Sequence, residues 1–477
     1  MKTFYDIQLK MLHFTGILPL TDIYDITWKR VCYNIYTIIV IMLEIPAPFA
    51  QFVTIYQNWG VLEITTGVIF QVCFYFNNAS IYMYLLFNRN RLRHATCSVA
   101  RKFVEQFGLK ELDIYDTIRK KAFAFNKVLL WVILLINSVT YFFWLIMPFT
   151  LWCTEYQNLN DVEEMNGYNT GQWRYFIYMT WVPQNALEYP IYNFIYLYQW
   201  FALSVILVLY YGYNLMLFSQ IIDISSQFNA LLVFLKEIDK MTLCMDNVLL
   251  QDDESNSKST IFNKVSNMAT TTHLAAANMN LKNIEEFTNS HIKERFDIMD
   301  DLYMDNIFTE PIIDNLNKKE KELYSYLINC IKFHQYILKR VEEINKVYSP
   351  ILFVVFTIGM VMMCTTVFQV TVGSGQGTNM KLLTATITVW FPISLICYFG
   401  DKITQKSLEV QKVILSGQWY EKSIRFQKLM LILIMRAQKP VQLTGGKFFT
   451  ASLETFSQVA NKVYAYYTVL KQMKDSE

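Results

Sequence analysis

The chain has 477 residues, of which 53% are hydrophobic, 16% aromatic and only 17% charged. Soluble domains average about 25% charged residues, so this composition excludes an ordinary soluble protein, and the mean hydropathy of +0.22 agrees. The net charge of +2 gives no indication of a nucleic-acid partner, and we expect none.

Seven segments are predicted to be transmembrane helices, because apolar runs of about 20 residues can cross a bilayer. They cover residues 31–56, 61–87, 128–151, 190–218, 350–372, 382–400 and 447–473, of which the last is the most polar. Pro46, Pro48 and Pro392 lie inside these segments and are expected to kink their helices. A membrane bundle tolerates such kinks, since neighbouring helices satisfy the freed backbone groups.

The charges of the connecting loops predict the orientation in the membrane. The loops after the second and sixth spans are rich in Lys and Arg, whereas the loop after the third carries Glu155, Asp161, Glu163 and Glu164 against Arg174. Because cytoplasmic loops carry the excess of basic residues, the N-terminus is predicted to be cytoplasmic and the C-terminus extracellular. A G-protein-coupled receptor has the opposite orientation.

These spans divide the chain into six predicted regions. In chain order they are a cytoplasmic segment over 1–30, spans one to four over 31–218, a cytoplasmic loop over 219–349, spans five and six over 350–400, a cytoplasmic anchor helix over 401–440, and the last span with a short extracellular tail over 441–477. The loop is expected to have helical ends and a polar, disordered insertion over 241–325.

The sequence contains no recognisable catalytic motif. The stretch "GSGQGT" over 373–378 lacks the ending of a phosphate-binding loop and follows a membrane span rather than a strand, so we interpret it as an outer turn. The five histidines form no metal-binding pattern, and no serine elbow or pair of catalytic carboxylates is present. We therefore expect no enzyme, and no catalytic residue, cofactor or metal.

Aromatic residues are dense in the second, third, fourth and sixth spans. They are consistent with ordinary packing and interfacial belts, or with a buried pocket for a small apolar ligand. For the second interpretation, the candidate ligand-binding residues are Phe74, Tyr75, Asn78, Ser138, Tyr141, Phe142, Leu145, Phe194, Tyr198, Thr388 and Trp390.

The last span is polar along one face. At 100° per residue, the apolar face holds Phe456, Val459, Ala460, Val463, Tyr464, Tyr466, Tyr467 and Leu470. The opposite face holds the candidate pore-lining residues Ser457, Gln458, Asn461, Lys462, Ala465 and Thr468, together with Glu454 and Gln472. Polar groups are costly against lipid, so this face should meet protein or water.

Two structures satisfy that requirement. One is a polar seam between helices of a single bundle. The other is a water-lined pore to which several subunits each contribute one helix around an axis. In a pore, a ring of Val469 and Met473 near the outer end could close the channel by dewetting, and Gln472 beside them could meet a permeating ion.

The segment from about 398 to 472 resembles the signature of insect odorant receptors. The matching pieces are Phe399-Gly400, Ser407, Trp419-Tyr420, Gln438-Lys439-Pro440, Gly446-Lys447-Phe448, Ser452-Leu453, Phe456 and Tyr466. Upstream, the resemblance is one of topology. The spacings of the Trp-Tyr, Lys-Pro and Gly-Lys-Phe pieces favour this family over the alternatives, which are a gustatory-type channel and a G-protein-coupled seven-helix receptor.

The resemblance implies an all-α integral membrane protein with seven transmembrane helices, which forms one subunit of a tetrameric channel with a central pore. It implies an odorant receptor, a non-selective cation channel opened by small volatile apolar ligands that bind among spans two, three, four and six. Val469 and Met473 match the family's hydrophobic gate, and Gln472 matches a polar pore residue. The implied partners are an odorant, permeant cations and lipid, in the plasma membrane of olfactory sensory neurons.

The length of the second inner loop departs from the family pattern. Most ligand-tuned members have a compact loop, whereas the insertion over 241–325 resembles the enlarged loop of the shared co-receptor. The membrane spans do not resemble the co-receptor. The resemblance therefore leaves open a homotetramer or a heterotetramer with a co-receptor, and we favour a ligand-binding receptor.

Overall fold

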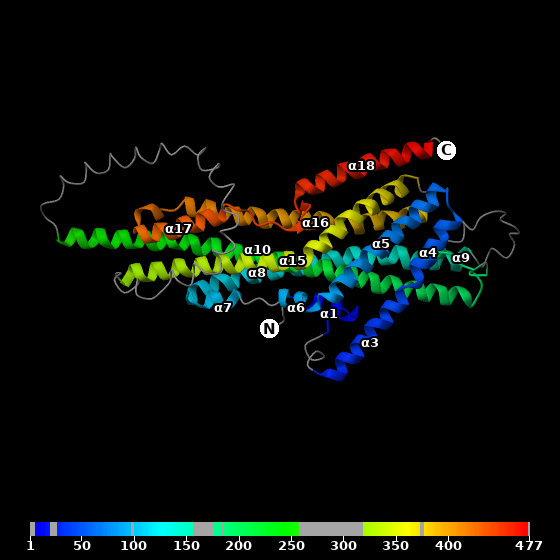
Figure 1. Ribbon diagram of the computed structural model, residues 1–477, viewed down its shortest axis with the longest axis horizontal. Coiled ribbons are helices and arrows are strands. Elements are labelled where there is room, and N and C mark those ends of the chain that lie inside the picture. The colour runs from blue at the N-terminus through cyan, green and yellow to red at the C-terminus, as the bar shows by residue number, and fades with distance from the viewer. Residues whose placement is uncertain are drawn as a thin grey trace. The chain divides into compact units, whose positions relative to one another are not determined.

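The computed structural model describes residues 5–19, 26–96, 100–155, 175–183, 185–256, 318–372 and 376–475, and they are mostly helical (Figure 1). They form two compact units, of which unit 1 comprises residues 1–232, 332–415 and 432–477 and unit 2 comprises 233–331 and 416–431. The helical expectation is confirmed for the described residues, with two short strands as the exception.

Helices overlap every predicted span, and several of them extend well beyond it. The first half of the chain contains α1 (Asp6–Phe14), α3 (Thr27–Glu44), α4 (Pro46–Gln57), α5 (Leu62–Phe87), α6 (Arg89–Thr96), α7 (Ala100–Glu105), α8 (Leu109–Tyr141), the π-helix η1 (Phe142–Ile146) and α9 (Met147–Glu155). The second half contains α10 (Ile191–Asn256), α15 (Lys318–Val372), α16 (Gln376–Leu415), the short 3-10 helix η5 (Trp419–Glu421), α17 (Ile424–Ala437), β1 (Thr444–Gly445), β2 (Phe449–Thr450) and α18 (Leu453–Asp475).

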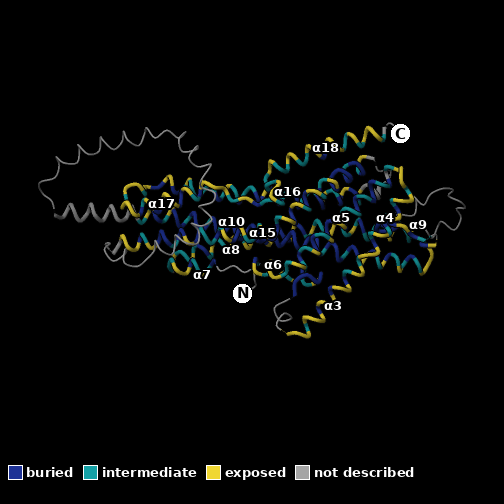
Figure 2. The backbone as a smooth tube through the Cα atoms, in the orientation of Figure 1, coloured by how far each residue is buried: buried dark blue, intermediate teal, exposed yellow. Residues whose placement is uncertain are grey.

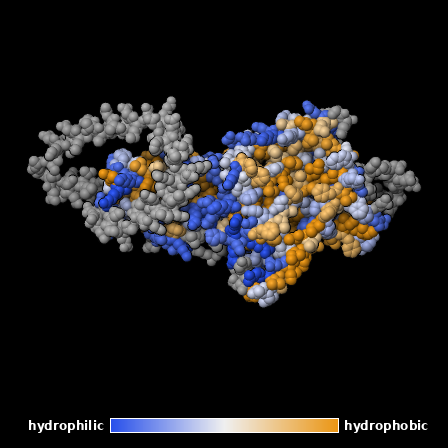
Figure 3. All heavy atoms as spheres, in the orientation of Figure 1, coloured by the Kyte–Doolittle hydropathy of each residue, from blue (hydrophilic) through white to orange (hydrophobic). Residues whose placement is uncertain are grey.

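Five helical segments are long and apolar enough to cross a membrane: Thr27–Gln57, Lys110–Thr154, Ile191–Met241, Glu320–Thr371 and Met380–Leu415. The first of them exposes a row of large apolar side chains, including Val31, Ile35, Ile38 and Met42. Figure 3 shows hydrophobic residues gathered on the part of unit 1 that carries α3 and the helices beside it. An apolar surface of this extent suits contact with lipid.

Pro46 and Pro48 lie where the first span is interrupted, whereas Pro392 does not interrupt its helix. The first span is interrupted at Ile45, where α3 ends at Glu44 and α4 begins at Pro46. Proline suits the first position of a helix, where its missing N–H would have no partner. Pro392, by contrast, lies inside the continuous helix α16.

Three predicted boundaries differ from the structure. Helix α10 continues to Asn256 and α15 begins at Lys318, so the ends of the predicted disordered insertion over 241–325 are helical. Residues 257–317 of that insertion lie outside the described residues. The segment expected to be one anchor helix over 401–440 is instead the end of α16, the turn with η5, and α17.

After α16 the chain passes close to one side chain of unit 2. A β-carbon on Gly417 would lie 2.3 Å from a carboxylate oxygen of Asp239, so a larger residue there would require the Asp239 side chain to shift. Helix α16 ends at Leu415, just before this close approach.

The last helix begins at Leu453 rather than near 447, because a hairpin precedes it. Thr444 pairs with Thr450 and Gly445 with Phe449. Residues 446–448 connect the strands, and Gly446 at φ 58 and Lys447 at φ 66 both adopt the left-handed conformation within this turn. A helical projection of the sequence cannot detect this turn.

The hairpin is held against α15 and α16 by hydrogen bonds. The Gly446 amide donates to the Ser349 carbonyl at 3.0 Å, and the Thr444 amide donates to the Asn345 side chain at 2.9 Å. The Val441 amide donates to the Ser407 hydroxyl at 3.0 Å. The start of α18 is therefore fixed to two long helices of unit 1.

The N-terminal segment that contains α1 packs against α10 through buried polar contacts. The Tyr5 hydroxyl donates to the Asp223 carboxylate at 3.2 Å, and the Gln8 amide donates to the Ser219 hydroxyl at 2.8 Å. Burial, together with the charge of Asp223, raises the pKa of the Tyr5 hydroxyl well above its ordinary value. The hydroxyl therefore stays protonated and remains a donor.

We predict that Gly400→Ala destabilises the protein by about 1–3 kcal/mol, the usual cost of overpacking a close contact. A β-carbon at this position of α16 would overlap the backbone oxygen of Ala451 just before α18. Thermal unfolding of the detergent-solubilised chain measures the effect. Gly212→Ala in α10 is the matched control, because its β-carbon would make only ordinary contacts with Met11 and Leu12. Equal stability of the two variants would contradict this packing.

Candidate functional site

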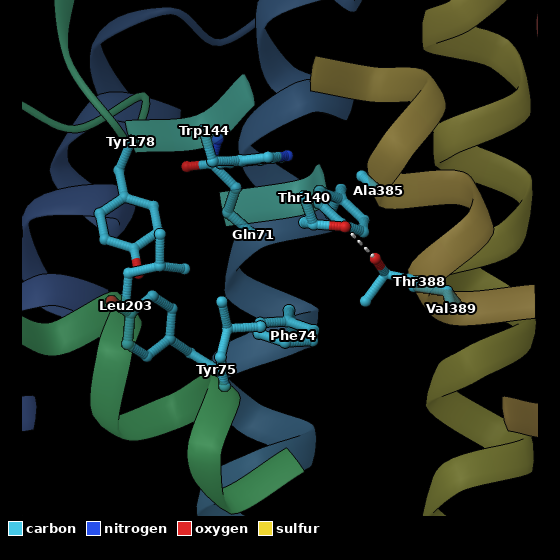
Figure 4. Close-up of a pocket in the computed structure, with 12 residues that line it drawn as sticks. Gln71, Phe74, Tyr75, Thr140, Trp144, Tyr178, Leu203, Ala385, Thr388 and Val389 are labelled. Carbon is cyan, nitrogen blue, oxygen red and sulfur yellow. Dashed lines mark hydrogen bonds between the residues drawn. The ribbon is translucent and has the colours of Figure 1, made fainter. Parts of the chain in front are cut away.

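A cavity of about 40 Å³ lies among α5, α8, η1, α10 and α16 of unit 1, and its wall is almost entirely apolar (Figure 4). The lining residues are Phe70, Gln71, Phe74, Tyr75, Thr140, Trp144, Tyr178, Leu203, Leu207, Ala385, Thr388 and Val389. A concave site with aromatic walls and a few polar groups is the usual form of a small-molecule pocket.

Polar side chains join the helices at one wall of the pocket. The hydroxyls of Thr140 and Thr388 lie 3.1 Å apart, which links α8 to α16, as the dashed line in Figure 4 marks. The Tyr210 hydroxyl of α10 donates to the Thr388 carbonyl at 3.1 Å, and the indole of Trp144 donates to the Lys381 carbonyl at 3.1 Å. These bonds hold three helices at fixed positions around the cavity.

A loop also contributes to the pocket. Residues Phe176, Ile177 and Tyr178 are buried although they belong to no helix. Gln199 accepts a hydrogen bond from the Ile177 amide at 2.9 Å, and Gln71 accepts one from the Met179 amide at 3.0 Å. Buried backbone amides need such partners, so the two glutamines allow the loop to enter the bundle and bring Tyr178 to the pocket.

The structure brings three of the predicted ligand-binding residues, Phe74, Tyr75 and Thr388, to this cavity. Ser138, Phe142 and Phe194 are exposed instead, and 71% of Phe194 is accessible. On a membrane helix, this exposure is consistent with a position facing lipid.

The remaining predicted residues make contacts away from the cavity wall. Tyr141 donates to the Ser204 hydroxyl at 2.6 Å, and Tyr198 donates to the Leu43 carbonyl at 3.1 Å. The carbonyl of Leu145 accepts a hydrogen bond from Tyr196. Asn78 donates to the Phe74 carbonyl in its own helix, and Trp390 packs edge-to-face on Phe456 of α18, with ring centroids 6.1 Å apart.

Sequence reasoning missed nine of the twelve lining residues, among them Thr140, Trp144 and Tyr178. Thr140 and Trp144 are four residues apart, the spacing of one helix face, and both belong to the aromatic-rich third predicted span. The π-helix over Phe142–Ile146 changes the helical register within this run. No periodic pattern marks Tyr178, because it lies in a loop.

Helix α18 leaves its polar face open within this single chain (Figure 2). Five of the candidate pore-lining residues, Ser457, Gln458, Asn461, Lys462 and Ala465, are exposed, and Thr468 is half-buried. On the apolar side, Val463 is buried, whereas Tyr464 and Tyr466 are exposed, so that side is only partly covered. The accessible fractions of Val469 and Met473 are 54% and 52%, and Gln472 is also exposed.

Comparison with known proteins identifies the family. The sequence profile of the family described as 7tm Odorant receptor matches residues 60–464, which is most of the chain. The chain belongs to this odorant receptor family. It is therefore a multi-pass membrane protein.

Individual proteins of the family match shorter stretches of this chain. Odorant receptor 67c of Drosophila melanogaster is 28% identical over 158 residues, which are 32% of this chain and 38% of that protein. The odorant receptor coreceptor of Anopheles gambiae is 27% identical over 160 residues, which are 33% of each chain. The matches thus span less than two fifths of the length of these relatives.

A solved structure covers nearly the whole fold. The insect olfactory receptor OR5 from Machilis hrabei, solved in complex with eugenol, superposes with a TM-score of 0.65 over 98% of both chains at 13% identity. At this identity the similarity establishes the fold.

We predict that Phe74→Ala weakens activation by a ligand of the pocket by roughly tenfold or more, since burying a phenyl ring contributes about 1.5–3 kcal/mol. Phe74 lines the cavity. Phe194→Ala is the matched control, because this ring is exposed. Concentration–response curves for the two variants measure the effect, and a larger loss in Phe194→Ala would place the ligand elsewhere.

Proposed function

We propose that the chain is a subunit of an odorant-gated, poorly selective cation channel. Seven spans, a cytoplasmic N-terminus and an extracellular C-terminus would place α18 in the membrane as the last span. Family membership supports this proposal, and so does the open polar face of α18, which one chain cannot enclose. Four copies of α18 around an axis would turn these polar faces toward a water-filled pore.

The cytoplasmic ends of the long helices would hold most contacts between subunits. Under the proposed topology, the regions over 1–30, 219–349 and 401–440 lie inside the cell. Helix α17 exposes Ile424, Leu431 and Met435 in the single chain, and these apolar side chains suit burial against another subunit. The partner subunits are further copies of this chain or the co-receptor, and the similarity to a coreceptor is compatible with such an assembly.

Helix α16 provides a direct connection between ligand binding and the pore. It carries Thr388 at the pocket, and two residues later it carries Trp390 against Phe456 of α18. A ligand that binds more tightly to the conformation with one placement of α16 increases the population of that conformation. Helix α18 would move together with α16, because the two helices are in contact. The difference in affinity between the closed and open states sets the size of the response.

The proposed function is tested by recording odorant-evoked currents in cells that express the chain alone and together with an insect odorant co-receptor. We expect cation currents across the plasma membrane in at least one of the two cases. In the animal, the receptor would lie in the plasma membrane of olfactory sensory neurons. Absence of current in both cases across a broad odorant panel, with the chain present at the surface, would contradict the proposal.

We also predict that replacing Val469 and Met473 together with serine raises the basal current. These two side chains, repeated in each subunit, would form the hydrophobic gate, which excludes water when the apolar side chains face the pore axis. Serine hydroxyl groups at the same positions would keep the constriction hydrated. Leu470→Ser is the matched control, because Leu470 lies on the apolar side of α18 and is half-buried. Whole-cell current without odorant is the measurement, and an unchanged basal current and selectivity would place the gate elsewhere.

A further inference from the structure

An open groove of about 690 Å³ lies between α1 and the beginning of α3. Helix α1 contributes Lys10 and Phe14 to its lining, and α3 contributes Trp28 and Lys29. None of the residues that line the groove belongs to the cavity in Figure 4, so the groove is a separate site.

Hydrogen bonds hold the two walls of the groove together. The Tyr33 hydroxyl of α3 donates to the His13 carbonyl at 2.9 Å, and the Tyr36 hydroxyl donates to the Phe14 carbonyl at 2.5 Å. The rings of His13 and Tyr33 also stack, with centroids 5.0 Å apart. A groove whose walls are already joined needs little ordering when a ligand binds, which favours affinity.

The charges in the groove are positive. Lys10 is exposed and Lys29 is half-buried, and the Lys29 amine lies 5.8 Å from the centre of the Trp28 ring. No acidic residue is among the described residues that line the groove, and neither lysine forms an ion pair with the described part of the chain. Two ammonium groups without a counter-charge favour an anion as the occupant.

The groove lies where a membrane-spanning helix begins. Helix α3 opens the first segment that is long and apolar enough to cross a membrane, Thr27–Gln57. The accessible fraction of Trp28 is 65%, and the exposed residues Val31, Ile35 and Ile38 follow it at the spacing of one helix face. Figure 3 shows hydrophobic residues along α3. An occupant of the groove can therefore continue along an apolar surface.

We propose that this groove binds one anionic phospholipid of the cytoplasmic leaflet, with its phosphate held between Lys10 and Lys29. The inference goes beyond the proposed function and uses only its membrane orientation, which puts the beginning of α3 at the cytoplasmic surface. The indole of Trp28 would lie at the level of the headgroups, where tryptophan is favoured. One acyl chain would follow the row of Val31 and Ile35.

Two features of the lipid should be needed together. Phosphatidylserine carries a net negative charge, which lysines near an anionic membrane surface attract. In phosphatidylcholine the choline cation opposes the attraction between the phosphate and the lysines. A soluble headgroup such as glycerophosphoserine has the charge but no acyl chain to cover the apolar row.

The test titrates purified full-length protein in detergent with dioctanoyl phosphatidylserine, dioctanoyl phosphatidylcholine or glycerophosphoserine. Microscale thermophoresis measures each Kd. We expect phosphatidylserine to bind roughly tenfold or more tightly than the other two probes. Lys10→Gln combined with Lys29→Gln should raise the Kd for phosphatidylserine by roughly tenfold or more, because both cations beside the phosphate are lost.

Lys120→Gln combined with Lys121→Gln is the matched control. It removes the same charge from two exposed lysines of α8 that do not line the groove, and it should leave the Kd within about threefold of wild type. Equal affinity for the two lipids, equal affinity for the soluble headgroup, or the same change of Kd in both double variants would overturn the inference. Failure of both lipids to bind would also overturn it and leave the groove to a protein contact.

The melting temperature of each variant shows whether it is folded. If the Lys10→Gln, Lys29→Gln double variant is not folded, the two single variants decide the question, and each should raise the Kd for phosphatidylserine by about fivefold. Because binding is measured without recording a current, a negative result here leaves the channel proposal standing. Absence of odorant-evoked current would equally leave the lipid site standing.

Discussion

The contact between α16 and α18 is the packing interaction on which the proposed function depends. At one end of this contact Gly400 lies against the backbone of Ala451, and further along Trp390 lies on Phe456. The hairpin over 444–450 holds the beginning of α18 by hydrogen bonds to α15. Five polar-face residues of α18, Ser457, Gln458, Asn461, Lys462 and Ala465, remain exposed in the single chain.

The pocket depends on a different constraint: backbone N–H groups that are buried away from water need hydrogen-bond acceptors. A loop enters the helical bundle only if its N–H groups find acceptors, and Gln71 and Gln199 supply them. Tyr178 reaches the cavity as a consequence. Glu44 is the opposite case, since its carboxylate oxygens have no donor among the described residues.

Much of the helical framework could be predicted from the sequence. Apolar runs of membrane-spanning length predicted the positions of α3 to α5, α10 and α15, and Pro46 predicted the break in the first span. The helical ends of the loop over 219–349 were predicted, whereas the continuation of α10 into 241–256, the start of α15 at Lys318 and the hairpin before α18 were not. Their polar residues resemble loop composition.

The candidate pocket was predicted less well than the framework. Phe74, Tyr75 and Thr388 line the cavity, whereas Phe194 is exposed although its span is just as aromatic. Composition shows which spans are aromatic. It does not show which way each ring points, because that depends on helix rotation, on the π-helix over 142–146 and on the entry of a loop.

The sequence by itself determined the membrane class, the order of the spans, the two-faced last helix and the family, because each depends on local hydropathy, periodicity or spacing along the chain. Only the tertiary structure decided which side chains share a cavity, that α16 joins the pocket to α18, and that the carboxylate oxygens of Glu44 are buried without a hydrogen-bond partner among the described residues. These features join residues that are distant in sequence, and the free energy of burying a charge depends on all of its neighbours at once.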